Sequence, residues 1–350
     1  KKNLGTRITD APFVIGVGPG FYAGKDCHCV IETKRGHTLG SVIWEKEAIP
    51  NTGVPGNIGG FTTERLIRAS ADGIMEPVAE IGDTVEKGQL VARTGKQPVY
   101  AKMSGIVRGM LQKDVQVTEG LKIGDIDARC EPEHCGTISD KARAVGGGVL
   151  EAVSLFGQIY GNYGVALLAA GEAKRFGSDK LSEKFQGIPL YRHALEKLEA
   201  FSGLSRVVVT AREALAEEAQ RLGIHIVENR QPEQGISHSV SLALQELLSQ
   251  NPDLEGVLFL VCDQPGIQAA TIQKILKEGC LHKNSIVCAG YDGMRGNPVL
   301  WGSTYFQELM HLTGDTGGRQ LMKQYEEKIR IVECAPEELK DIDRREDMTE

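Results

Sequence analysis

The sequence contains an apolar run that passes directly into a small-residue loop: Val165-Ala166-Leu167-Leu168-Ala169-Ala170-Gly171-Glu172-Ala173-Lys174-Arg175-Phe176-Gly177-Ser178-Asp179-Lys180. An apolar run that ends at a glycine is typical of a buried strand. The small side chains at 169–171 leave the backbone open to a phosphate chain, and Arg175 and Lys180 bring two positive charges beside it. The loop has neither the ATPase phosphate-loop motif nor the dinucleotide fingerprint. We therefore expect residues 168–180 to bind a nucleotide triphosphate in another way.

From Tyr163 onward, apolar strands alternate with helices, which predicts an α/β half with a mostly parallel sheet. The expected strands span residues 164–169, 206–210, 225–228, 256–262 and 285–289. The expected helices span residues 190–200, 212–222, 240–249 and 271–277. Two glycines and an asparagine interrupt the periodicity at 157–163, so we expect the junction between two domains there.

An acidic residue, Asp263, ends the expected strand at 256–262. Open α/β sheets bind ligands at the carboxyl ends of their strands. Carboxylates are the hard oxygen ligands that Mg²⁺ prefers, and Mg²⁺ bridges protein carboxylates and substrate phosphates. We therefore expect Asp263 to bind Mg²⁺. The alternative is an aspartate that caps the following turn.

Residues 1 to about 155 are rich in glycine and in short alternating runs, which predicts a mostly β half. An internal repeat matches Gly73-Ile74 with Gly105-Ile106, Val85 with Val117 and Gly88 with Gly120. The pattern resembles the two quasi-symmetric halves of a lipoyl-like barrel-sandwich. Lys96 lies in the turn between the halves but lacks the Met or Asp neighbours of those families, so we interpret it as an ordinary hairpin lysine. The run at 146–148, three glycines, is expected to permit close packing or a turn.

The net charge of −7 and the pI near 5.7 argue against a nucleic-acid or anionic-membrane partner, because either needs a clustered basic surface. The longest apolar runs are far shorter than the roughly 20 residues of a membrane helix. Eight cysteines without an N-terminal apolar segment favour a reducing compartment. We therefore expect a soluble, cytoplasmic protein. Because the chain begins at Lys1 rather than at methionine, we expect it to be a piece of a longer one.

Two groups of cysteine and histidine are candidates for a metal site. Residues 27–29, Cys-His-Cys, alternate along an expected strand, so their side chains point to opposite faces and do not share one ion. Cys130, His134 and Cys135 are better spaced for a metal but lack a second CxxC-like pair. Buried or incidental thiols are therefore the default interpretation.

The loop at 168–180 fits the pattern LAAGxxxRxGxxK and in this resembles GT-A-type nucleotidyltransferases. Three further segments occur in the order found in the molybdenum cofactor cytidylyltransferases, which are MobA-like NTP transferases: 234–240 (Gln-Gly-Ile-Ser-His-Ser-Val), 295–300 (Arg-Gly-Asn-Pro-Val-Leu) and 314–319 (Gly-Asp-Thr-Gly-Gly-Arg). The segment 341–347 resembles the closing DIDTPED of that family. This chain departs from the family at His238, at Asn297 and at 344–345, where two arginines replace Thr-Pro.

The resemblance implies a GT-A/Rossmann-like fold and Mg²⁺-dependent transfer of CMP from CTP to the phosphate of molybdopterin or the molybdenum cofactor. It implies these catalytic residues: Arg175, Lys180 and Asp263. It implies these nucleotide-binding residues: Leu168, Ala169, Ala170, Gly171, Arg175, Lys180, Gly235, Ser237 and Ser239. Arg295, Asn297 and Arg319 are implied for the acceptor, and Asp263 and Asp343 for the metal.

In this interpretation an acceptor phosphate oxygen attacks the α-phosphorus of the nucleotide and expels pyrophosphate. A general base is not needed, because a phosphate monoester is already anionic at neutral pH. Ala170 stands where guanylyl-transferring relatives commonly have glycine, and its methyl group narrows the slot for a purine. The hydroxyls of Ser237 and Ser239 suit the small polar edge of cytosine. We therefore expect CTP to be preferred over GTP.

Residues 1–156 resemble the accessory factor of the selenium-dependent molybdenum hydroxylase system. The resemblance rests on the segments 18–21, 31–37, 122–127 and 138–141. We therefore expect two fused domains, a mostly β accessory domain at 1–156 and an NTP transferase domain at 163–350. A molybdenum hydroxylase apoprotein is the further partner that this fusion implies.

Two other functions fit the sequence. One is a non-catalytic chaperone that binds the molybdenum cofactor and inserts it into a hydroxylase. The other is a nucleotidyltransferase for a sugar or polyol phosphate on the same scaffold. The acceptor pocket is built from irregular loops, so the sequence does not separate these acceptors.

Overall fold

The computed structural model describes residues 3–52, 56–129, 131–171, 176 and 179–349. Contacts divide the chain into two compact units. The larger unit comprises Lys1–Glu32, Ser41–Ala48 and Gly148–Glu350, and the smaller unit comprises Thr33–Gly40 and Ile49–Gly147. These units differ from the expected division at 1–156 and 163–350, because most of the first 48 residues belong to the same compact unit as the C-terminal half.

The larger unit is built on a seven-stranded sheet with the order β18-β17-β14-β19-β21-β20-β22. Its strands are β14 (Tyr163–Leu168), β17 (Ser205–Thr210), β18 (His225–Glu228), β19 (Gly256–Val261), β20 (Ile286–Tyr291), β21 (Met294–Gly302) and β22 (Ile329–Glu333). Strands β14, β17, β18 and β19 are parallel, and only β21 runs antiparallel to its neighbours among these strands. The prediction of an α/β half with a mostly parallel sheet is confirmed.

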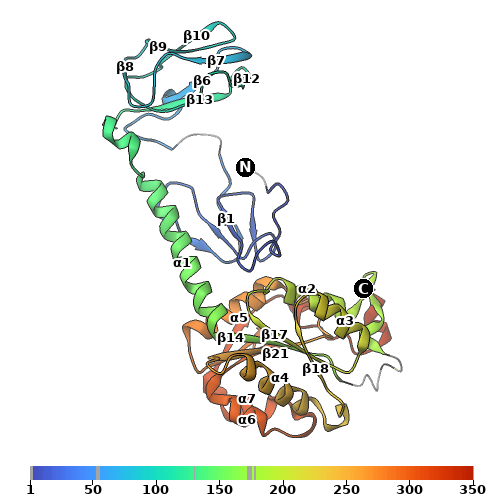
Figure 1. Cartoon of the computed structure of the whole chain (residues 1–350). Coiled ribbons are helices and arrows are strands. Elements are labelled where there is room, and N and C mark those ends of the chain that lie inside the picture. The colour runs from blue at the N-terminus through green and yellow to red at the C-terminus, as the bar shows by residue number, and fades with distance from the viewer. Residues whose placement is uncertain (1–2, 53–55, 130, 172–175, 177–178, 350) are drawn as a thin grey trace. The chain divides into compact units, whose positions relative to one another are not determined.

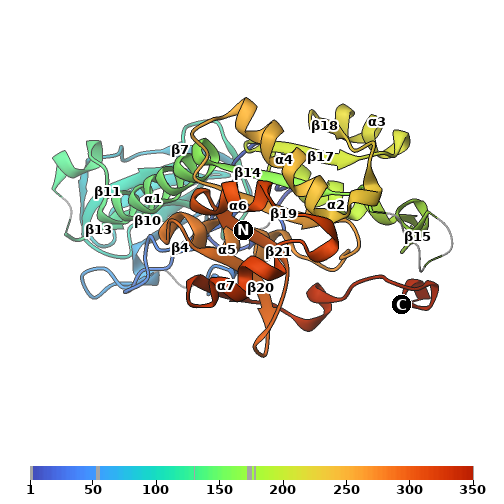
Figure 2. The ribbon, with the colours of Figure 1, turned by 90° about the horizontal axis from the view of Figure 1, so that it is seen from below.

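Helices cover both faces of this sheet (Figure 1). One face packs against α2 (Leu190–Glu199), α3 (Glu213–Arg221) and α5 (Ala269–Leu281). The other packs against α4 (Ile236–Gln250), α6 (Phe306–Met310) and α7 (Arg319–Gln324), which lie in front of the strands in Figure 2. In β14, Val165 and Leu167 enter one core, while Ala166 and Leu168 enter the other. Because both faces are covered, the strand is apolar at every position.

One helix, α1 (Asp140–Asn162), runs through the segment where we expected the junction. The prediction of interrupted structure at 157–163 is therefore wrong. The buried residues Ala152, Phe156 and Ile159 recur at helical spacing, and this apolar stripe specifies the helix. A glycine in a helix costs only about 1 kcal/mol relative to alanine, so burial of the stripe outweighs the glycines.

The three glycines at 146–148 also lie inside α1, so the turn expected there is wrong. A Cβ added at Gly146 or Gly147 would meet no described atom within 4 Å beyond the helix's own backbone, so these two glycines do not permit close packing either. The half that we expected to be mostly β therefore ends in a helix.

The N-terminal part of the larger unit contains short strands around a small core. The strands are β1 (Ile15–Val17), β2 (Tyr22–Ala23), β3 (Cys29–Ile31), β4 (Val42–Ile43) and β5 (Lys46–Glu47). His28 is fully buried there. Its Nδ1 accepts a hydrogen bond from the backbone N–H of Val14 at 3.0 Å, and its Nε2 lies 2.7 Å from the carbonyl oxygen of Ala200. These partners fit a neutral ring with the proton on Nε2.

The buried state of His28 predicts a pH-dependent stability. Burial lowers the pKa of His28 from 6.5 to about 4. Between these values the unfolded chain binds a proton that the folded chain excludes, so this contribution is complete above 6.5 and is lost as the pH falls toward 4. Between about pH 7 and pH 5, we expect the wild type to lose about 2 kcal/mol more of its free energy of unfolding than His28→Gln loses.

Urea unfolding at the two pH values measures this difference. The exposed His225 is the control position, and His225→Gln should keep the wild-type loss. Equal losses in the wild type and in His28→Gln would show that another group is responsible.

The smaller unit contains two four-stranded antiparallel sheets, with the orders β10-β9-β7-β12 and β6-β13-β11-β8. The strands are β6 (Leu66–Arg68), β7 (Gly73–Pro77), β8 (Thr84–Val85), β9 (Leu90–Thr94), β10 (Gln97–Tyr100), β11 (Gly105–Met110), β12 (Gln116–Val117) and β13 (Lys122–Asp127). Both sheets contribute residues to one core, for example Val91 and Val107. Repeat-related residues take equivalent places, because Gly73 pairs with Val117 while Gly105 pairs with Val85.

Lys96 lies at the turn between β9 and β10 with a φ of +71° and is exposed. The prediction that it is a hairpin residue is confirmed.

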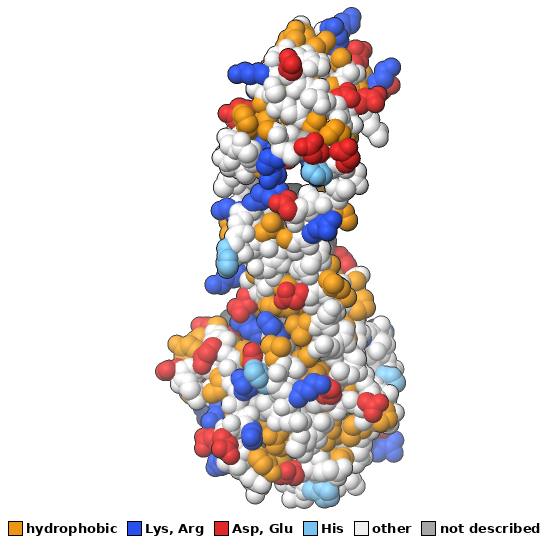
Figure 3. All heavy atoms as spheres, turned by 90° about the vertical axis from the view of Figure 1, so that its left-hand side faces the viewer, with side chains coloured by type: hydrophobic (Ala, Val, Ile, Leu, Met, Phe, Trp, Pro, Cys, Tyr) orange, Lys and Arg blue, Asp and Glu red, His pale blue; other side chains and the backbone are white. Residues whose placement is uncertain are grey.

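Among the described helices, none is long and apolar enough to cross a membrane. On the face drawn in Figure 3, described Lys and Arg side chains are interspersed with Asp and Glu.

Candidate active site

A pocket of about 440 Å³ lies where β14 and β19 end at their carboxyl ends. Its walls are Leu168, Ala169, Ala170, Gly171, Phe176, Lys180, Leu181, Pro232, Glu233, Gly235, Ile236, Ser239, Val261, Cys262, Asp263, Asp315 and Asp343. The carboxyl edge of a parallel sheet is the usual ligand site of α/β folds. The pocket thus contains most of the residues that we expected to bind nucleotide and metal. Arg175 lies outside the described residues.

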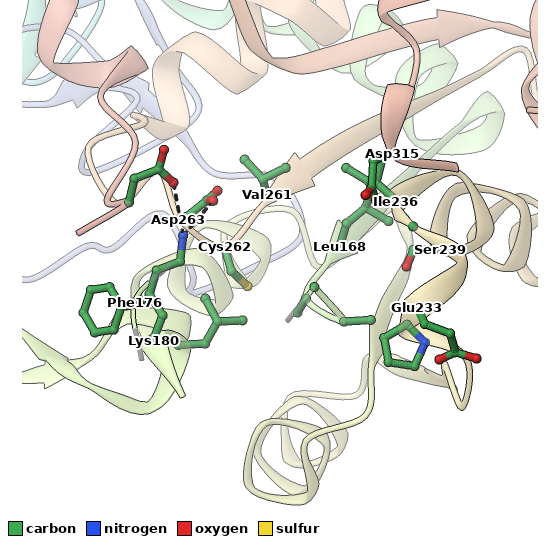
Figure 4. Close-up of a pocket in the computed structure, with 17 residues that line it drawn as sticks. Leu168, Phe176, Lys180, Glu233, Ile236, Ser239, Val261, Cys262, Asp263 and Asp315 are labelled. Carbon is green, nitrogen blue, oxygen red and sulfur yellow. Dashed lines mark hydrogen bonds and ion pairs between the residues drawn. The ribbon is translucent and has the colours of Figure 1, made fainter. Parts of the chain in front are cut away.

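Three charged side chains meet on one side of the pocket (Figure 4). The ammonium Nζ of Lys180 lies 3.0 Å from Oδ2 of Asp263 and 3.7 Å from Oδ1 of Asp343. The Lys180 side chain is 11% exposed, whereas those of Asp263 and Asp343 are 32% and 54% exposed. Two carboxylates therefore face a common cationic position from the open side of the pocket.

A backbone hydrogen bond brings the C-terminal segment to this edge. The N–H of Ile342 donates to the carbonyl oxygen of Asp263 at 2.8 Å. Next to it, Gln264 Nε2 donates to Asp341 Oδ1 at 2.8 Å. Partial burial of its carboxyl group and then the charge of Asp263 raise the pKa of Asp341. The carboxylates of Asp263 and Asp341 therefore lie close enough to interact at this edge of the sheet.

The opposite side of the pocket is the start of α4 (Figure 4). Gly235 precedes the helix with a φ of +84°, and a Cβ there would lie 2.5 Å from Oδ1 of Asp315. Glycine is therefore required at this position. The hydroxyl of Ser239 lines the pocket and accepts a hydrogen bond from Asn229 Nδ2 at 3.0 Å. The helix N-terminus beside it favours negative charge.

Ser237 has a different environment from Ser239. Its side chain is fully buried and does not line the pocket. Its Oγ has no hydrogen-bond partner among the described residues. We expected both hydroxyls to face the base, but only Ser239 lines the pocket, because the segment is the first turn of a helix rather than a loop.

The three residues expected at the acceptor lie together in a second pocket of about 570 Å³. Arg295, Asn297 and Arg319 line it with Gln264, Met294, Gly296, Pro336, Glu337, Leu339, Lys340 and Asp341. Gln264 follows Asp263 directly, and Asp341 comes two residues before Asp343, so the same two segments contribute to both pockets. Arg295 also donates to Glu326 at 3.0 Å.

Arg212 was not among the expected site residues, although its side chain contacts the loop at 168–180. Its Nη1 donates to the carbonyl oxygen of Ala169 at 2.5 Å, and its Nε donates to Asp179 at 2.6 Å. One signal pointed to it, because Arg212 closely follows a strand that we expected to be parallel to β14. The carboxyl ends of neighbouring parallel strands lie at one edge of the sheet. Positively charged side chains that follow either strand are therefore candidates for the same site.

Thiol chemistry is not favoured at this site. Cys262 lines the pocket but is 3% exposed, and burial raises the pKa of its thiol. The described residues contain no group of three or more His, Cys, Asp or Glu arranged to hold a metal ion. The site offers two carboxylates, and Mg²⁺ commonly uses one or two together with substrate phosphates.

The geometry agrees with a family match. Residues 165–329 match the family model of the MobA-like NTP transferase domain. The match covers just under half of the chain and includes the strands and loops that form most of the first pocket. The α/β part of the larger unit is therefore similar to MobA-like NTP transferase domains.

Several proteins are similar to parts of this chain. The uncharacterized protein YqeB of Escherichia coli is 55% identical over 155 residues, which cover 44% of this chain and 29% of that protein. The purine catabolism protein PucB of Bacillus subtilis is 28% identical over 168 residues, which cover 45% of this chain and 78% of that protein. A probable molybdenum cofactor guanylyltransferase of Thermococcus gammatolerans is 37% identical over 62 residues, which cover 18% of this chain and 32% of that protein. The chain thus spans less than a third of the length of YqeB.

Among solved structures, part of this chain is similar to Rv0371c from Mycobacterium tuberculosis, with a TM-score of 0.46 and 22% identity over 53% of this chain and 94% of that chain. A nucleotidyl transferase from Methanothermobacter thermautotroptrophicus has a TM-score of 0.45 and 17% identity over 53% of this chain and 94% of that chain.

Proposed function

We propose that the MobA-like domain transfers CMP from CTP to the phosphate of molybdopterin or the molybdenum cofactor and releases pyrophosphate. The observation that carries this proposal is the convergence of the loop at 168–171 with Lys180, Asp263 and Asp343 in one pocket. The names of the T. gammatolerans and related proteins, probable molybdenum cofactor guanylyltransferases, support the acceptor class. The choice of CTP rests on the sequence resemblance.

In the proposed reaction, the acceptor phosphate attacks the α-phosphorus and the pyrophosphate leaves. This chain's contribution is alignment and charge neutralisation, which need no general base. Lys180 and Arg175 would neutralise the triphosphate. The backbone at 169–171 and the N-terminus of α4 would hold the nucleotide between them.

A divalent cation fits the charges of the site. Asp263 and Asp343 both approach one cationic group, the Nζ of Lys180, so their carboxylates are aimed at a shared position. We propose that these two carboxylates hold Mg²⁺ with the nucleotide. The ion would supply charge stabilisation at the phosphates.

The second pocket supports a phosphate-bearing acceptor. Arg295, Arg319 and Lys340 line it, and arginine suits bidentate contacts to phosphate. Asn297 is proposed as a further acceptor contact. The same pocket would serve a sugar or polyol phosphate, so the acceptor must be tested directly.

The choice of nucleotide is the first test of the proposal. The methyl group of Ala170 lines the nucleotide pocket and should narrow the slot for a purine, while the Ser239 hydroxyl suits cytosine. We expect a higher kcat/KM for CTP than for GTP, by a few kcal/mol at most in transition-state free energy, or up to about 10²-fold. Pyrophosphate release is measured with each of the four nucleotides and molybdopterin.

A higher kcat/KM for GTP would contradict the cytidylyl assignment. Release of pyrophosphate with none of the four would favour a non-catalytic cofactor chaperone. Release with sugar or polyol phosphates but not with molybdopterin would support the other transferase.

For the rest of the chain we propose an accessory role in the maturation of a selenium-dependent molybdenum hydroxylase, with the apoprotein as partner. We also propose that the smaller unit is a lipoyl-like barrel-sandwich. The two sheets around one core, with repeat-related pairs, support this. The family domains are proposed at 1–156 and 163–350.

A further inference from the structure

Arg212 lies beside the nucleotide pocket but comes from a different strand than the loop at 168–180. It follows β17, the parallel neighbour of β14, and directly precedes α3. Its backbone N–H donates to Thr210 Oγ1 at 3.0 Å, which fixes the start of its side chain. The side chain is 19% exposed, so it points inward rather than into solvent.

The guanidinium group of Arg212 joins the two ends of that loop. At the first end, Nη1 donates to the carbonyl oxygen of Ala169 at 2.5 Å and Nη2 donates to that of Gly171 at 3.1 Å. At the last end, Nε donates to Asp179 Oδ1 at 2.6 Å. Three nitrogens of one rigid, planar group thus serve three acceptors, which no other side chain type can do.

The contacts at the first end orient the backbone. A trans peptide places its C=O and N–H on opposite sides. Because the carbonyl of Ala169 is turned toward Arg212, the N–H of Ala170 is turned away from it. Ala170 lines the nucleotide pocket, and backbone N–H groups are common phosphate donors in such turns.

The contact at the last end bears on Lys180. Asp179 also accepts a hydrogen bond from Ser182 Oγ at 2.5 Å, so its carboxylate is held from two sides. Burial opposes its ionisation, but these hydrogen bonds outweigh burial and lower the pKa of Asp179. Fixing Asp179 fixes the residue that follows it, whose Nζ lies 3.0 Å from Asp263.

We propose that Arg212 is a positioning residue that links the backbone at 169–171 to Asp179 and so holds that backbone and Lys180 in place for the triphosphate. This inference rests on the proposed function. Arg212 acts through the loop rather than through its charge. A lysine, with a single nitrogen on a flexible chain, therefore cannot replace it.

The test compares Arg212→Gln and Arg212→Lys with Arg221→Gln. Arg221 lies in α3, is 76% exposed and pairs with Glu217, so it is a matched surface control. We expect both Arg212 variants to lose about 10²-fold in kcat/KM for CTP, the typical result of a displaced catalytic group. Arg221→Gln should equal the wild type. Millimolar guanidinium chloride should partly restore Arg212→Gln, which a merely folding-related loss would not show.

Hydrogen–deuterium exchange of the full chain gives a readout that does not need activity. Peptides covering 168–181 should exchange faster in both Arg212 variants, while peptides from β19 and α5 should be unchanged. Unchanged exchange at 168–181 would overturn the inference, as would wild-type kinetics in Arg212→Lys. If the wild type releases no pyrophosphate from any nucleotide, the proposed function fails, but faster exchange at 168–181 would still support the link through Arg212.

Discussion

Asp263→Ala should abolish nucleotidyl transfer while the domain stays folded. The carboxylate ends β19 at the pocket wall, and one of its oxygens contacts Lys180. Removing it deletes one of two carboxylates proposed for Mg²⁺, and the transition-state charge would then lack its main stabiliser. The side chain is polar and 32% exposed, so stability should change little. Pyrophosphate release and the melting temperature are the two measurements.

Asp253→Ala provides the control for this change. Asp253 is exposed and lies before the other end of β19. We expect wild-type turnover from it, because that edge of the sheet carries none of the pocket residues. Retention of more than a small fraction of the wild-type rate in Asp263→Ala would contradict the metal assignment, whereas a large fall in melting temperature would show a structural role instead.

The central strands could be placed from the sequence because burial on both faces leaves a simple signal. Strands β14 and β19 are buried along nearly their whole length, so they appear as continuous apolar runs. Strand β18 has an apolar centre between two polar ends, and its centre is only partly buried. Strand β21 was not among the expected strands. Only its first two residues are exposed, but it contains Gly296 and Pro298, which are typical of a loop in sequence although the segment pairs with β20.

The glycines in α1 misled the sequence analysis for a related reason. Glycine is a local signal, whereas the helix is specified by side chains that find partners far away in the sequence. Phe156, for example, stacks on Phe13 and on Trp44. These contacts are between residues far apart in the sequence, so the local sequence pattern does not indicate them. The predicted junction is wrong because long-range packing outweighs the low helix propensity of glycine.

The site shows the same division between local and long-range information. The loop at 168–180 and Asp263 are marked by their places after strands. Asp343 could be predicted only from the family resemblance, because its approach to Asp263 depends on the backbone hydrogen bond of Ile342. Arg212 was not predicted, because its side chain bonds to the backbone carbonyl oxygens of Ala169 and Gly171, and no sequence motif specifies such contacts.

Lys180→Ala should lower kcat by about 10²-fold or more, the typical loss of one charge-stabilising group. Lys180 lies among two carboxylates, and its burial means that water replaces its charge poorly. In the variant, Asp263 and Asp343 would repel each other, so the nucleotide complex should form with less favourable geometry as well.

Lys184→Ala is the matched control, since Lys184 is an exposed lysine of the neighbouring strand β15 (Lys184–Phe185) and should tolerate the change. Steady-state kinetics, with the concentrations of CTP and acceptor varied in turn, distinguish a role of Lys180 at the triphosphate from a role at the acceptor. A fall in kcat supports a role at the triphosphate, and a change confined to KM for the acceptor would show that Lys180 serves the other substrate.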